Sequence, residues 1–491
     1  MIAMTCGGVR RPVGTRGPWG AAVLALCLAA GSLRAGEVGI TVDNARSRQV
    51  MEGFGATTMS LVHPGALGDT LTPELRKKAI DACYGQVKLT MGNLEVGFSR
   101  RPHATDASPK YDTFGSEAMK SRLIDLAQPL GFADYMLSAK LRGGKPEDGA
   151  DQAVSAAIFW RDRFKISPRH LMPFNEPTSG NCEVGGGQTH AVVAIIKSLG
   201  KRLRDEGFKD TMLVAPCEET VARSLEVAKA ILEDAEARPY VGAIGYHCYP
   251  YGSPYASVRN ILEHSGKGKP PPHEIELRRN LRDLAARHGL PLWMTEVSHA
   301  EAPALSFDLL RGRAIHIHDE LAYADAAAFF AMNNIWDLTS HRDHFKGRGG
   351  DAKDALYTEM DTVVLVDNEK EAVHITGTGY AIGHYARWVR RGAVRLEADA
   401  ADPLVQVTAF RDDAQQRLVL VIINNSPQAQ TARVNVKGLG LSGPVAGEQS
   451  TEKAFWHRIE PFETTAPSAF KVVLPPLSVT SLGAYLSASR R

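Results

Sequence analysis

The fold of this chain is indicated most clearly by residues 169–177, which read Arg-His-Leu-Met-Pro-Phe-Asn-Glu-Pro. The short apolar run within them lies between two helical patterns, which is the helix–strand–helix order of a parallel α/β sheet. Pro177 cannot continue a central strand, so the strand ends there with Glu176 at its carboxyl end. In α/β barrels the chemistry lies at this end of the strands. Glu176 is therefore a candidate catalyst, although an isolated glutamate in such a place is usually a solvated loop residue.

A second stretch repeats this design. Residues 291–298 read Pro-Leu-Trp-Met-Thr-Glu-Val-Ser, and a helical pattern over residues 274–288 precedes them. An apolar strand again ends in a glutamate, Glu296. Two glutamates at the ends of two buried strands indicate a carboxylate pair in one cleft, which is the arrangement that divides glycoside hydrolysis between an acid/base and a nucleophile. Counted along the chain, Glu176 follows the fourth strand and Glu296 the seventh.

Eight apolar strands alternate with helical patterns, which predicts a (β/α)₈ barrel with elaborated loops. Gly53 and Gly55 on either side of Phe54 indicate a tightly packed first strand. The expected strands are residues 51–57, 87–91, 132–137, 171–174, 211–215, 241–249, 292–296 and 329–335.

The pattern changes after an expected helix over residues 377–390. Five strands follow at short intervals with no helical stretch between them, which predicts an antiparallel β-sandwich. No flexible linker precedes this region, so we expect it to pack firmly on the barrel. The expected sandwich strands are residues 405–410, 417–424, 431–436, 455–459 and 470–474.

Composition excludes several classes of protein. The chain has 491 residues, of which 44% are hydrophobic and 23% charged, with a formal net charge of +2. This length is sufficient for two domains, and the near-neutral charge gives no reason to expect nucleic acid or an anionic membrane as a partner. We expect a monomer with no stable membrane insertion.

Residues 1–36 have the pattern of an export signal. Arg10, Arg11 and Arg16 precede the apolar run 21–30, and small residues follow it. The run is too short to span a bilayer. We therefore expect cleavage near Ala35 and a secreted or periplasmic protein.

The cysteines and histidines leave some alternatives open. Four cysteines follow the expected signal, and an exported protein allows either disulfides in any of three full pairings or buried free thiols; they are Cys83, Cys182, Cys217 and Cys248. The pairs His316/His318 and His341/His344 lack an obvious third metal ligand, so we expect them on solvated faces and expect no metal or other cofactor.

Several motifs together resemble glycoside hydrolase family 30, a clan A family of retaining glycosidases. Residues 53–56 (Gly-Phe-Gly-Ala), 174–177 (Phe-Asn-Glu-Pro) and 293–296 (Trp-Met-Thr-Glu) occur in the order seen in that family. Residues 379–395 resemble its last barrel helix and the entry to its sandwich, and 474–480 resemble its final strand. The sequence patterns predict a signal peptide at 1–36, a catalytic barrel at 51–390 and a β-sandwich at 391–491, and the resemblance implies that residues 37–50 form an amino-terminal strand of the sandwich.

The resemblance also implies a reaction. Glu296 would be the nucleophile of a retaining double displacement and Glu176 the acid/base, while Asn175 would contact the 2-hydroxyl of the sugar. The expected substrate is a carbohydrate with β-glycosidic bonds, of the xylan, β-1,6-glucan or β-galactan type. Alternatives are a glucosylceramidase-like exo-β-glycosidase and an inactive carbohydrate-binding protein on the same fold.

Other residues at expected strand ends are candidates for binding the sugar. His247 and Tyr249 lie two apart on the sixth strand, so they point the same way, although each is also compatible with plain burial. Trp336, placed at the end of the eighth strand, is a candidate floor for the sugar ring or a core residue, and Asn93 follows the second strand. Weaker candidates are Glu95, Asp134 and Glu218.

Two stretches depart from the family's pattern. Residues 132–140 replace the Trp- and Pro-rich stretch that usually follows the third strand, and Gly92 and Asn93 lie where many members carry an arginine. Both regions shape the sugar site, so the particular substrates of the family do not transfer to this chain.

Overall fold

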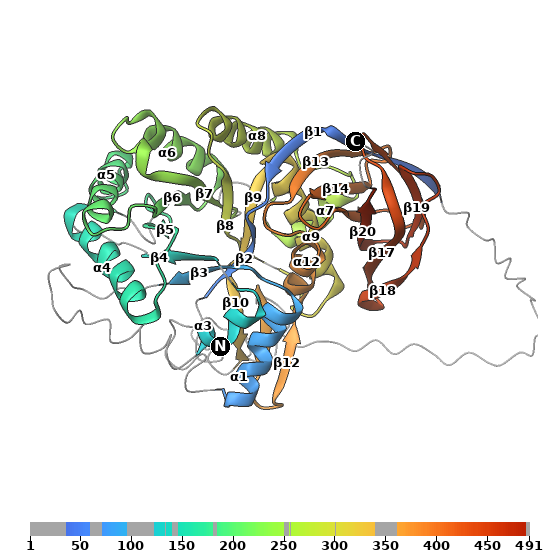
Figure 1. Cartoon of the computed structure of the whole chain (residues 1–491), viewed down its shortest axis with the longest axis horizontal. Helices are drawn as coiled ribbons and strands as arrows, with labels where there is room; N and C mark the ends of the chain where they lie inside the picture. The colour runs from blue at the N-terminus through green and yellow to red at the C-terminus, as the bar shows by residue number, and fades with distance from the viewer. Residues whose placement is uncertain are drawn as a thin grey trace, which may run out of the picture. The chain divides into compact units, whose positions relative to one another are not determined.

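Eight parallel strands close into a barrel (Figure 1). Each strand pairs with its neighbour in the chain, and the eighth, β9, returns to pair with the first, β2, through Phe54 opposite Phe329. The computed structural model describes residues 36–58, 71–95, 122–132, 134–139, 146–179, 184–249, 255, 257–299, 301–338 and 361–487. The barrel strands are β2 (Gly53–Thr57), β3 (Met91–Glu95), β4 (Asp134–Ser138), β5 (His170–Met172), β6 (Met212–Glu218), β7 (Val241–His247), β8 (Leu292–Glu296) and β9 (Ala326–Ala331).

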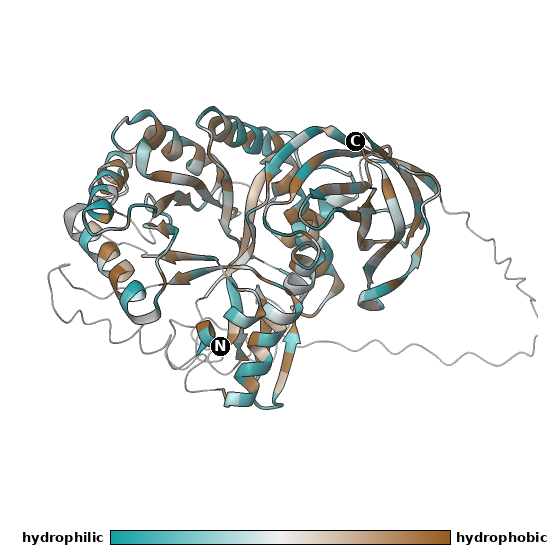
Figure 2. Ribbon diagram, in the orientation of Figure 1, coloured by the Kyte–Doolittle hydropathy of each residue, from teal (hydrophilic) through white to brown (hydrophobic). Residues whose placement is uncertain are grey.

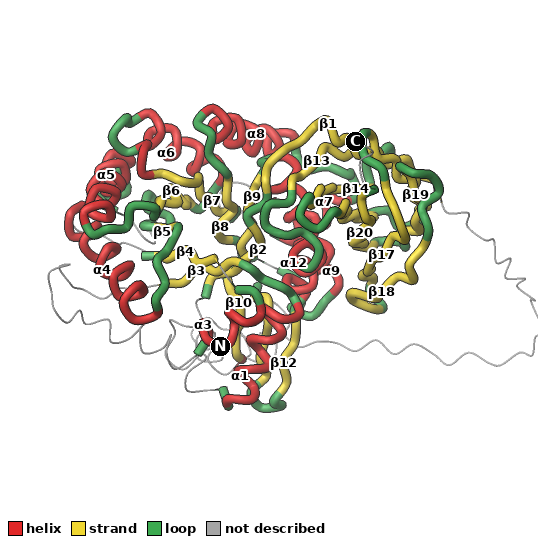
Figure 3. The backbone as a smooth tube through the Cα atoms, in the orientation of Figure 1, coloured by secondary structure: helices red, strands yellow, loops and turns green. Residues whose placement is uncertain are grey.

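Helices cover the outside of the barrel (Figure 3). Those on the outer surface are amphipathic, with an apolar stripe against the strands and a polar face outward (Figure 2). The helices over residues 307–323 and 377–386 differ, because they are buried on nearly all sides. Several helices begin after a serine or threonine whose side-chain oxygen accepts a hydrogen bond from the backbone N–H three residues later. Ser306, for example, accepts from Leu309 N–H at 3.2 Å. The helices are α1 (Pro73–Ile80), α3 (Leu123–Ala127), α4 (Pro146–Phe164), α5 (Thr189–Asp205), α6 (Val221–Glu233), α7 (Val258–Ser265), α8 (Pro272–Arg287), α9 (Phe307–Tyr323) and α12 (Gly377–Ala386).

The barrel interior is filled by side chains. Trp293 stacks on Phe330 with ring centroids 6.2 Å apart and contacts His170 at 4.5 Å. The first strand packs closely, as its glycines predict: a Cβ on Gly55 would lie 2.6 Å from a ring atom of Phe330 and 2.8 Å from the carbonyl oxygen of Met91. The interior is therefore a packed core, and a site can form only at the strand ends.

A nine-stranded sheet follows the barrel and includes the first described strand, β1. Figure 1 shows β1, in blue, among the orange and red strands. It pairs antiparallel with β13, Ile40 opposite Ala400, and parallel with β16, Ile40 opposite Val434. In spatial order the strands are β18 (Ala454–Phe462), β17 (Leu441–Thr451), β20 (Ser478–Leu486), β15 (Arg417–Asn424), β14 (Val405–Asp412), β13 (Val394–Ala400), β1 (Gly36–Val50), β16 (Gln430–Lys437) and β19 (Ala469–Leu474).

This sheet curls so that its two halves share one core. Ile40 and Val434 pack in the same buried cluster as Leu420 and Leu482, which come from the other half. The predicted fold class, a (β/α)₈ barrel with a carboxyl-terminal sandwich joined by an amino-terminal strand, is confirmed. The pairing of β1 with β16 makes the sheet mixed rather than wholly antiparallel.

Specific polar contacts join the barrel to the sheet. Gln49, near the end of β1, donates from Nε2 to the carbonyl oxygens of Leu321 and Ala326, both at 3.0 Å. His384 of α12 lies 2.8 Å from the hydroxyl of Ser481 and 2.8 Å from that of Ser450. The expected firm packing is therefore built from hydrogen bonds as well as apolar contact.

Two barrel strands differ from their predicted positions. The second strand is Met91–Glu95 rather than residues 87–91, because a π-helical turn, Asp81–Gln86, continues α1 and leaves Val87 and Leu89 buried behind it. The eighth ends at Ala331 rather than at 335. Residues beyond it form a separate three-stranded sheet, β10 (Asn333–Asp337), β11 (Thr362–Asp367) and β12 (Ala372–Ile375).

Other expectations concern single residues. Cys83, Cys217 and Cys248 are buried free thiols, so for these three the choice between disulfides and free thiols is decided in favour of free thiols. Cys182 lies outside the described residues. Residues 1–35 of the expected signal, 1–36, also lie outside them. Of the helices that are described, none has the length and apolar character to cross a membrane.

Candidate active site

Glu176 and Glu296 lie together at the carboxyl ends of the barrel strands. Both side chains are buried, with exposed fractions of 5% and 4%. One oxygen of each carboxylate and a ring nitrogen of His247 all lie within 4.8 Å of one another. The two stretches singled out in the sequence therefore meet at one point, after the fourth and seventh barrel strands.

A sharp turn presents Glu176. Strand β5 ends at Met172, and Glu176 takes the left-handed backbone conformation with φ +55°, which a non-glycine residue adopts only when its surroundings hold it there. Its N–H donates to the carbonyl oxygen of Cys217 on β6 at 2.9 Å, and its carbonyl accepts from Ser179 N–H at 3.1 Å. These bonds fix the turn against the neighbouring strand. Glu296 needs no such turn, because it is the last residue of β8.

The end of β7 supplies a partner for each carboxylate. Nδ1 of His247 lies 3.1 Å from Oε1 of Glu176, and the hydroxyl of Tyr249 donates to Oε1 of Glu296 at 2.6 Å. Both side chains face the same way, as their spacing of two residues predicts. Burial, together with the charge of Glu296, raises the pKa of Tyr249 well above its ordinary value. Tyr249 therefore keeps its proton and remains a donor to Glu296.

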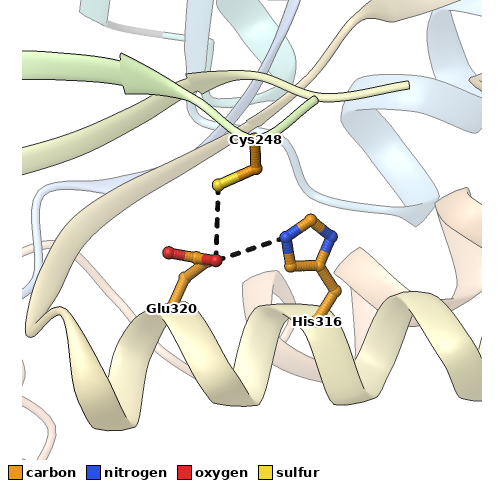
Figure 4. A group of neighbouring side chains, drawn as sticks. All are labelled: Cys248, His316 and Glu320. Carbon is orange, nitrogen blue, oxygen red and sulfur yellow. Dashed lines mark hydrogen bonds and ion pairs between the residues drawn. The ribbon is translucent and has the colours of Figure 1, made fainter. Parts of the chain in front are cut away.

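Tyr246 of β7 and Cys248, which directly follows this strand, contact a buried polar cluster on its outer side. Figure 4 shows Cys248, His316 and Glu320 of this cluster. The hydroxyl of Tyr246 donates to Oε2 of Glu320 at 2.8 Å, and the thiol of Cys248 donates to Oε1 at 3.4 Å. Nε2 of His316 lies 3.3 Å from the same Oε1. Glu320 and His316 come from α9, so this helix contacts β7 on the side away from Glu176 and Glu296. Sequence reasoning missed this cluster, whose only signal is the i, i+4 spacing of His316 and Glu320.

Arg278 of α8 neutralises Glu320. Its Nη2 and Nε lie 2.6 and 2.8 Å from Oε1 of Glu320, and its Nη1 lies 2.6 Å from Glu274. Burial alone would raise the pKa of Glu320, but the charge and hydrogen bonds of Arg278 and His316 together outweigh it and lower that pKa to about 2. The group Cys248, His316 and Glu320 has ligand types that suit a metal. The guanidinium already occupies the shared carboxylate, so a cation does not fit there.

One of the two histidine pairs also differs from expectation. His316 and His318 are buried, not solvated, and burial lowers the pKa of each. Their helix is covered on nearly all sides because it lies between the barrel and the sheet. His341 and His344 lie outside the described residues.

Glu218 is a third buried carboxyl at this end of the barrel. It is the last residue of β6, its side chain has no measurable exposure, and Oε2 accepts only a long bond, 3.5 Å, from Thr178 N–H. Desolvation raises the pKa of Glu218 to about 7. Sequence alone placed Glu218 among the weaker candidates, because it is followed directly by Glu219 and the sequence does not indicate which of the two side chains is buried.

The remaining candidates are divided between the strand ends and other places. Asn93 is buried in β3, and Asn175, 8% exposed, precedes Glu176. Trp336 is half-buried in β10 and packs on Leu338 and Leu365, so it does not end the eighth strand; its sugar-binding role stays a prediction. Two of the weaker candidates lie apart from each other: Glu95 ends β3, whereas Asp134 begins β4 and pairs with Arg391 at 2.5 Å, at the opposite end of the barrel.

Comparison with known proteins identifies the fold. No protein-family model matches the chain, and no curated protein matches it. The catalytic domain of the family 30 xylanase C from Talaromyces cellulolyticus aligns over 92% of this chain and 100% of its own, with a TM-score of 0.68 and 16% identity. A family 30 endoxylanase from Clostridium papyrosolvens C71 aligns over 91% and 100%, with a TM-score of 0.63 and 17% identity.

A third match has a different named activity. An endo-β-1,6-glucanase aligns over 91% of this chain and 94% of its own, with a TM-score of 0.62 and 17% identity. At these identities the likeness concerns the fold and not the substrate. From its closed barrel, its added sheet and these neighbours, the chain has the fold of the family 30 glycoside hydrolases.

Proposed function

We propose that this chain is an exported retaining β-glycosidase that cleaves a polysaccharide or oligosaccharide by double displacement. The observation that carries the proposal is the approach of Glu176 and Glu296, whose nearest oxygens lie within 4.8 Å. In retaining enzymes the carboxyl groups lie about 5–5.5 Å apart, whereas inverting enzymes leave roughly 6.5–9.5 Å for a water molecule. The short separation supports retention.

Glu296 is the nucleophile in this proposal. Its carboxylate attacks the anomeric carbon while the bond to the leaving oxygen breaks, and Glu176 gives its proton to that oxygen. A covalent glycosyl ester on Glu296 results. Glu176, now ionised, takes a proton from water, and the hydroxide attacks the anomeric carbon and releases Glu296. The product has the configuration of the substrate.

The neighbours of the pair suit these roles. Tyr249 donates to Oε1 of Glu296 and so fixes the direction from which the nucleophile approaches. His247 contacts the acid/base through Nδ1 and so helps to fix the position of its carboxyl group. Asn175 lies next to Glu176 in the chain and is the candidate partner of the 2-hydroxyl, where bonding strengthens in the transition state.

The experiment is a substrate screen followed by a stereochemical measurement. The purified chain is incubated with xylan, β-1,6-glucan, β-galactan and aryl β-glycosides, and proton NMR records the first anomer released. The proposal expects cleavage of at least one β-linked substrate with retention. First release of the α-anomer would mean inversion. Binding of these sugars with no cleavage would favour the inactive carbohydrate-binding alternative.

Export belongs to the same proposal. It is supported by the arginines and the apolar run within residues 1–35. Expression of the whole chain in a bacterial host, followed by amino-terminal sequencing of the protein outside the cytoplasm, checks it. A mature protein that begins close to Gly36 agrees with the proposal, and an uncut cytoplasmic chain contradicts it.

A further inference from the structure

A pocket of about 560 Å³ lies away from the carboxylate pair. Residues of α1, β12, α12 and β18, which Figure 1 labels, are among those that line it. Its volume is within the range of ligand pockets, on the order of 300–1,000 Å³. Neither catalytic candidate and none of their hydrogen-bond partners lines it, so the barrel mouth does not account for it. We call it the lateral pocket and define it by Lys78, Asp81, Glu371, His374, Tyr380 and Phe455.

The aromatic side of the lateral pocket is rigid. Tyr380 of α12 packs edge to face on Phe455 of β18, with ring centroids 4.8 Å apart. It packs in the same way on Trp456, with ring centroids 4.6 Å apart. Trp456 is fixed in turn, because its Nε1 donates to the carbonyl oxygen of Tyr380 at 3.0 Å and Arg387 lies over its ring at 4.4 Å. The two rings that line the pocket therefore form a surface that is in place before any ligand arrives.

The polar side of the lateral pocket has unused hydrogen-bonding groups. Among the described residues, the side chains of Lys78, Glu371 and His374 and the hydroxyl of Tyr380 have no hydrogen-bond or ion-pair partner. Asp81 accepts one bond, from Gln86 Nε2 at 3.1 Å. Donors and acceptors thus stand around the aromatic surface, each with capacity for a ligand.

This combination selects the chemistry of the ligand. A pyranose has apolar C–H faces, which pack on aromatic rings, and a rim of hydroxyls that both donate and accept. Asp81 and Glu371 outnumber the single ammonium of Lys78, so an anion such as a phosphate or an acidic sugar is disfavoured. A neutral saccharide satisfies both sides of the pocket.

We propose that the lateral pocket is a second carbohydrate-binding site, which holds a neutral segment of the polysaccharide while another segment occupies the barrel mouth. The choice of ligand rests on the proposed function, but the pocket itself does not. Its effect is to raise the local concentration of a polymeric substrate, as a second binding module does. Short substrates that reach only the barrel mouth gain nothing from it.

The test uses the full chain carrying Glu296→Gln, which cannot turn a probe over by the proposed mechanism. It is titrated calorimetrically with xylohexaose and, separately, with a β-1,6-linked glucohexaose. We expect two sites for at least one probe. The double substitution Glu371→Ala and His374→Ala should weaken one site by about tenfold or more, because it removes a carboxyl group and an imidazole that can each hydrogen-bond the ligand. Glu452→Ala, exposed in the turn between β17 and β18, is the matched control and should keep both sites.

A second measurement uses the active chain. The double substitution should reduce the rate on polymer and leave kcat/KM on an aryl glycoside unchanged. A single site in the intact chain, or two sites that survive the double substitution, overturns the inference. A chain that cleaves substrate but has one site refutes only the pocket, whereas binding at the pocket with no cleavage of any substrate refutes only the proposed function. Both altered residues are at least partly exposed, and Lys78→Ala offers an independent disruption of the same wall.

Discussion

Glu176 and Glu296 reach the same point by different local routes. Glu296 ends a strand, whereas Glu176 depends on a left-handed turn that the backbone of β6 holds through Cys217. The roles of the two carboxylates can be separated because only one of them forms a bond to the sugar in the proposed mechanism.

Glu296→Ala should abolish turnover of every substrate, since no glycosyl ester can form. Glu176→Ala should reduce the rate by about 10²–10⁴-fold for poor leaving groups and much less for the first step on an activated aryl glycoside. Azide needs no general base, so it should rescue Glu176→Ala and give a β-glycosyl azide of retained configuration. NMR of the azide product of each variant checks the assignment. Inverted azide from Glu176→Ala with retained azide from Glu296→Ala would exchange the two roles.

The raised pKa of Glu218 should make the free energy of unfolding depend on pH. Its pKa in the folded chain is raised from an ordinary 4.5 to about 7, so the folded state holds more protons than the unfolded state between these values. Stability should therefore fall as the pH rises from about 4.5 to about 7. Glu218→Gln should stabilise the fold at pH 8, by on the order of 1–3 kcal/mol, and have little effect at pH 4.

Urea unfolding of both proteins at these two pH values measures the effect. Burial raises the pKa of Asp319 to about 7 as well, so Glu218→Gln should keep part of the slope. Glu276→Gln, on an exposed residue of α8, should change stability at neither pH. Equal unfolding free energies for Glu218→Gln and the unaltered chain at pH 8 would show that Glu218 carries no such penalty.

The proposed chemistry places no metal between the carboxylates. Although Glu176, His247 and Glu296 could together offer three ligand atoms, the mechanism needs those atoms for proton transfer and nucleophilic attack. Dialysis against EDTA should leave kcat/KM on an aryl glycoside within error, and added Zn²⁺ should inhibit by occupying the pair. Loss of activity in EDTA, restored by a divalent ion, would contradict a metal-free reaction.

At the scale of the element, β7 is held from both sides. Its outward residues bond to Glu320, and its inward residues touch the two catalytic candidates. Glu320→Gln leaves Arg278 with less compensation in a buried place, so we expect a loss of roughly 3–5 kcal/mol in unfolding free energy. Tyr246→Phe removes one bond to a charged group and should cost about 1.5–3 kcal/mol. Denaturant unfolding of the two variants checks this order, and the reverse order would show that Arg278 is not neutralised by Glu320.

Periodicity predicted most strands, and it failed where apolar residues serve another element. Residues 87–90 have the composition of a strand, but a π-helical turn precedes them, and the strand begins only at Met91. Gly438 and Gly443 have the spacing of a loop between two strands, yet β17 begins at Leu441, between them. A glycine in an irregular part of a strand has the same signature as a glycine in a loop, so sequence could not separate the two.

At the scale of the whole molecule, β1 should be indispensable. It buries Val38, Ile40 and Val42 in the core of the curled sheet, and each such side chain contributes about 1.5–3 kcal/mol. A chain that begins at Met51 should therefore lose most of its stability and become insoluble or protease-sensitive. A peptide of residues 36–50 should restore it in trans, and the same peptide with Ile40→Asp should not. A stable, active protein from Met51 onward would contradict an integral sandwich.

The location of the candidate site was readable from sequence because parallel strands collect their carboxyl ends on one face. That rule brought Glu176, Glu296 and the pair His247 and Tyr249 together from three separate stretches. It could not indicate the bonds behind them, since Arg278 and Glu320 lie on helices whose rotation is set by tertiary packing. The lateral pocket was equally invisible, because its walls come from four elements with no shared motif.

The place of β1 in the sheet also sets an order of events during synthesis. Ile40 leaves the ribosome long before Ala400 and Val434, the residues on either side of it. Until they arrive, both edges of β1 expose unpaired backbone groups and its apolar face has no core to enter. The barrel is translated before β13 and β16, so β1 stays unpaired until both have left the ribosome. Pairing over so long a stretch of chain is slow. A nascent chain of this design therefore depends on a chaperone, or on a quickly completed barrel, to keep its first strand from pairing with another copy.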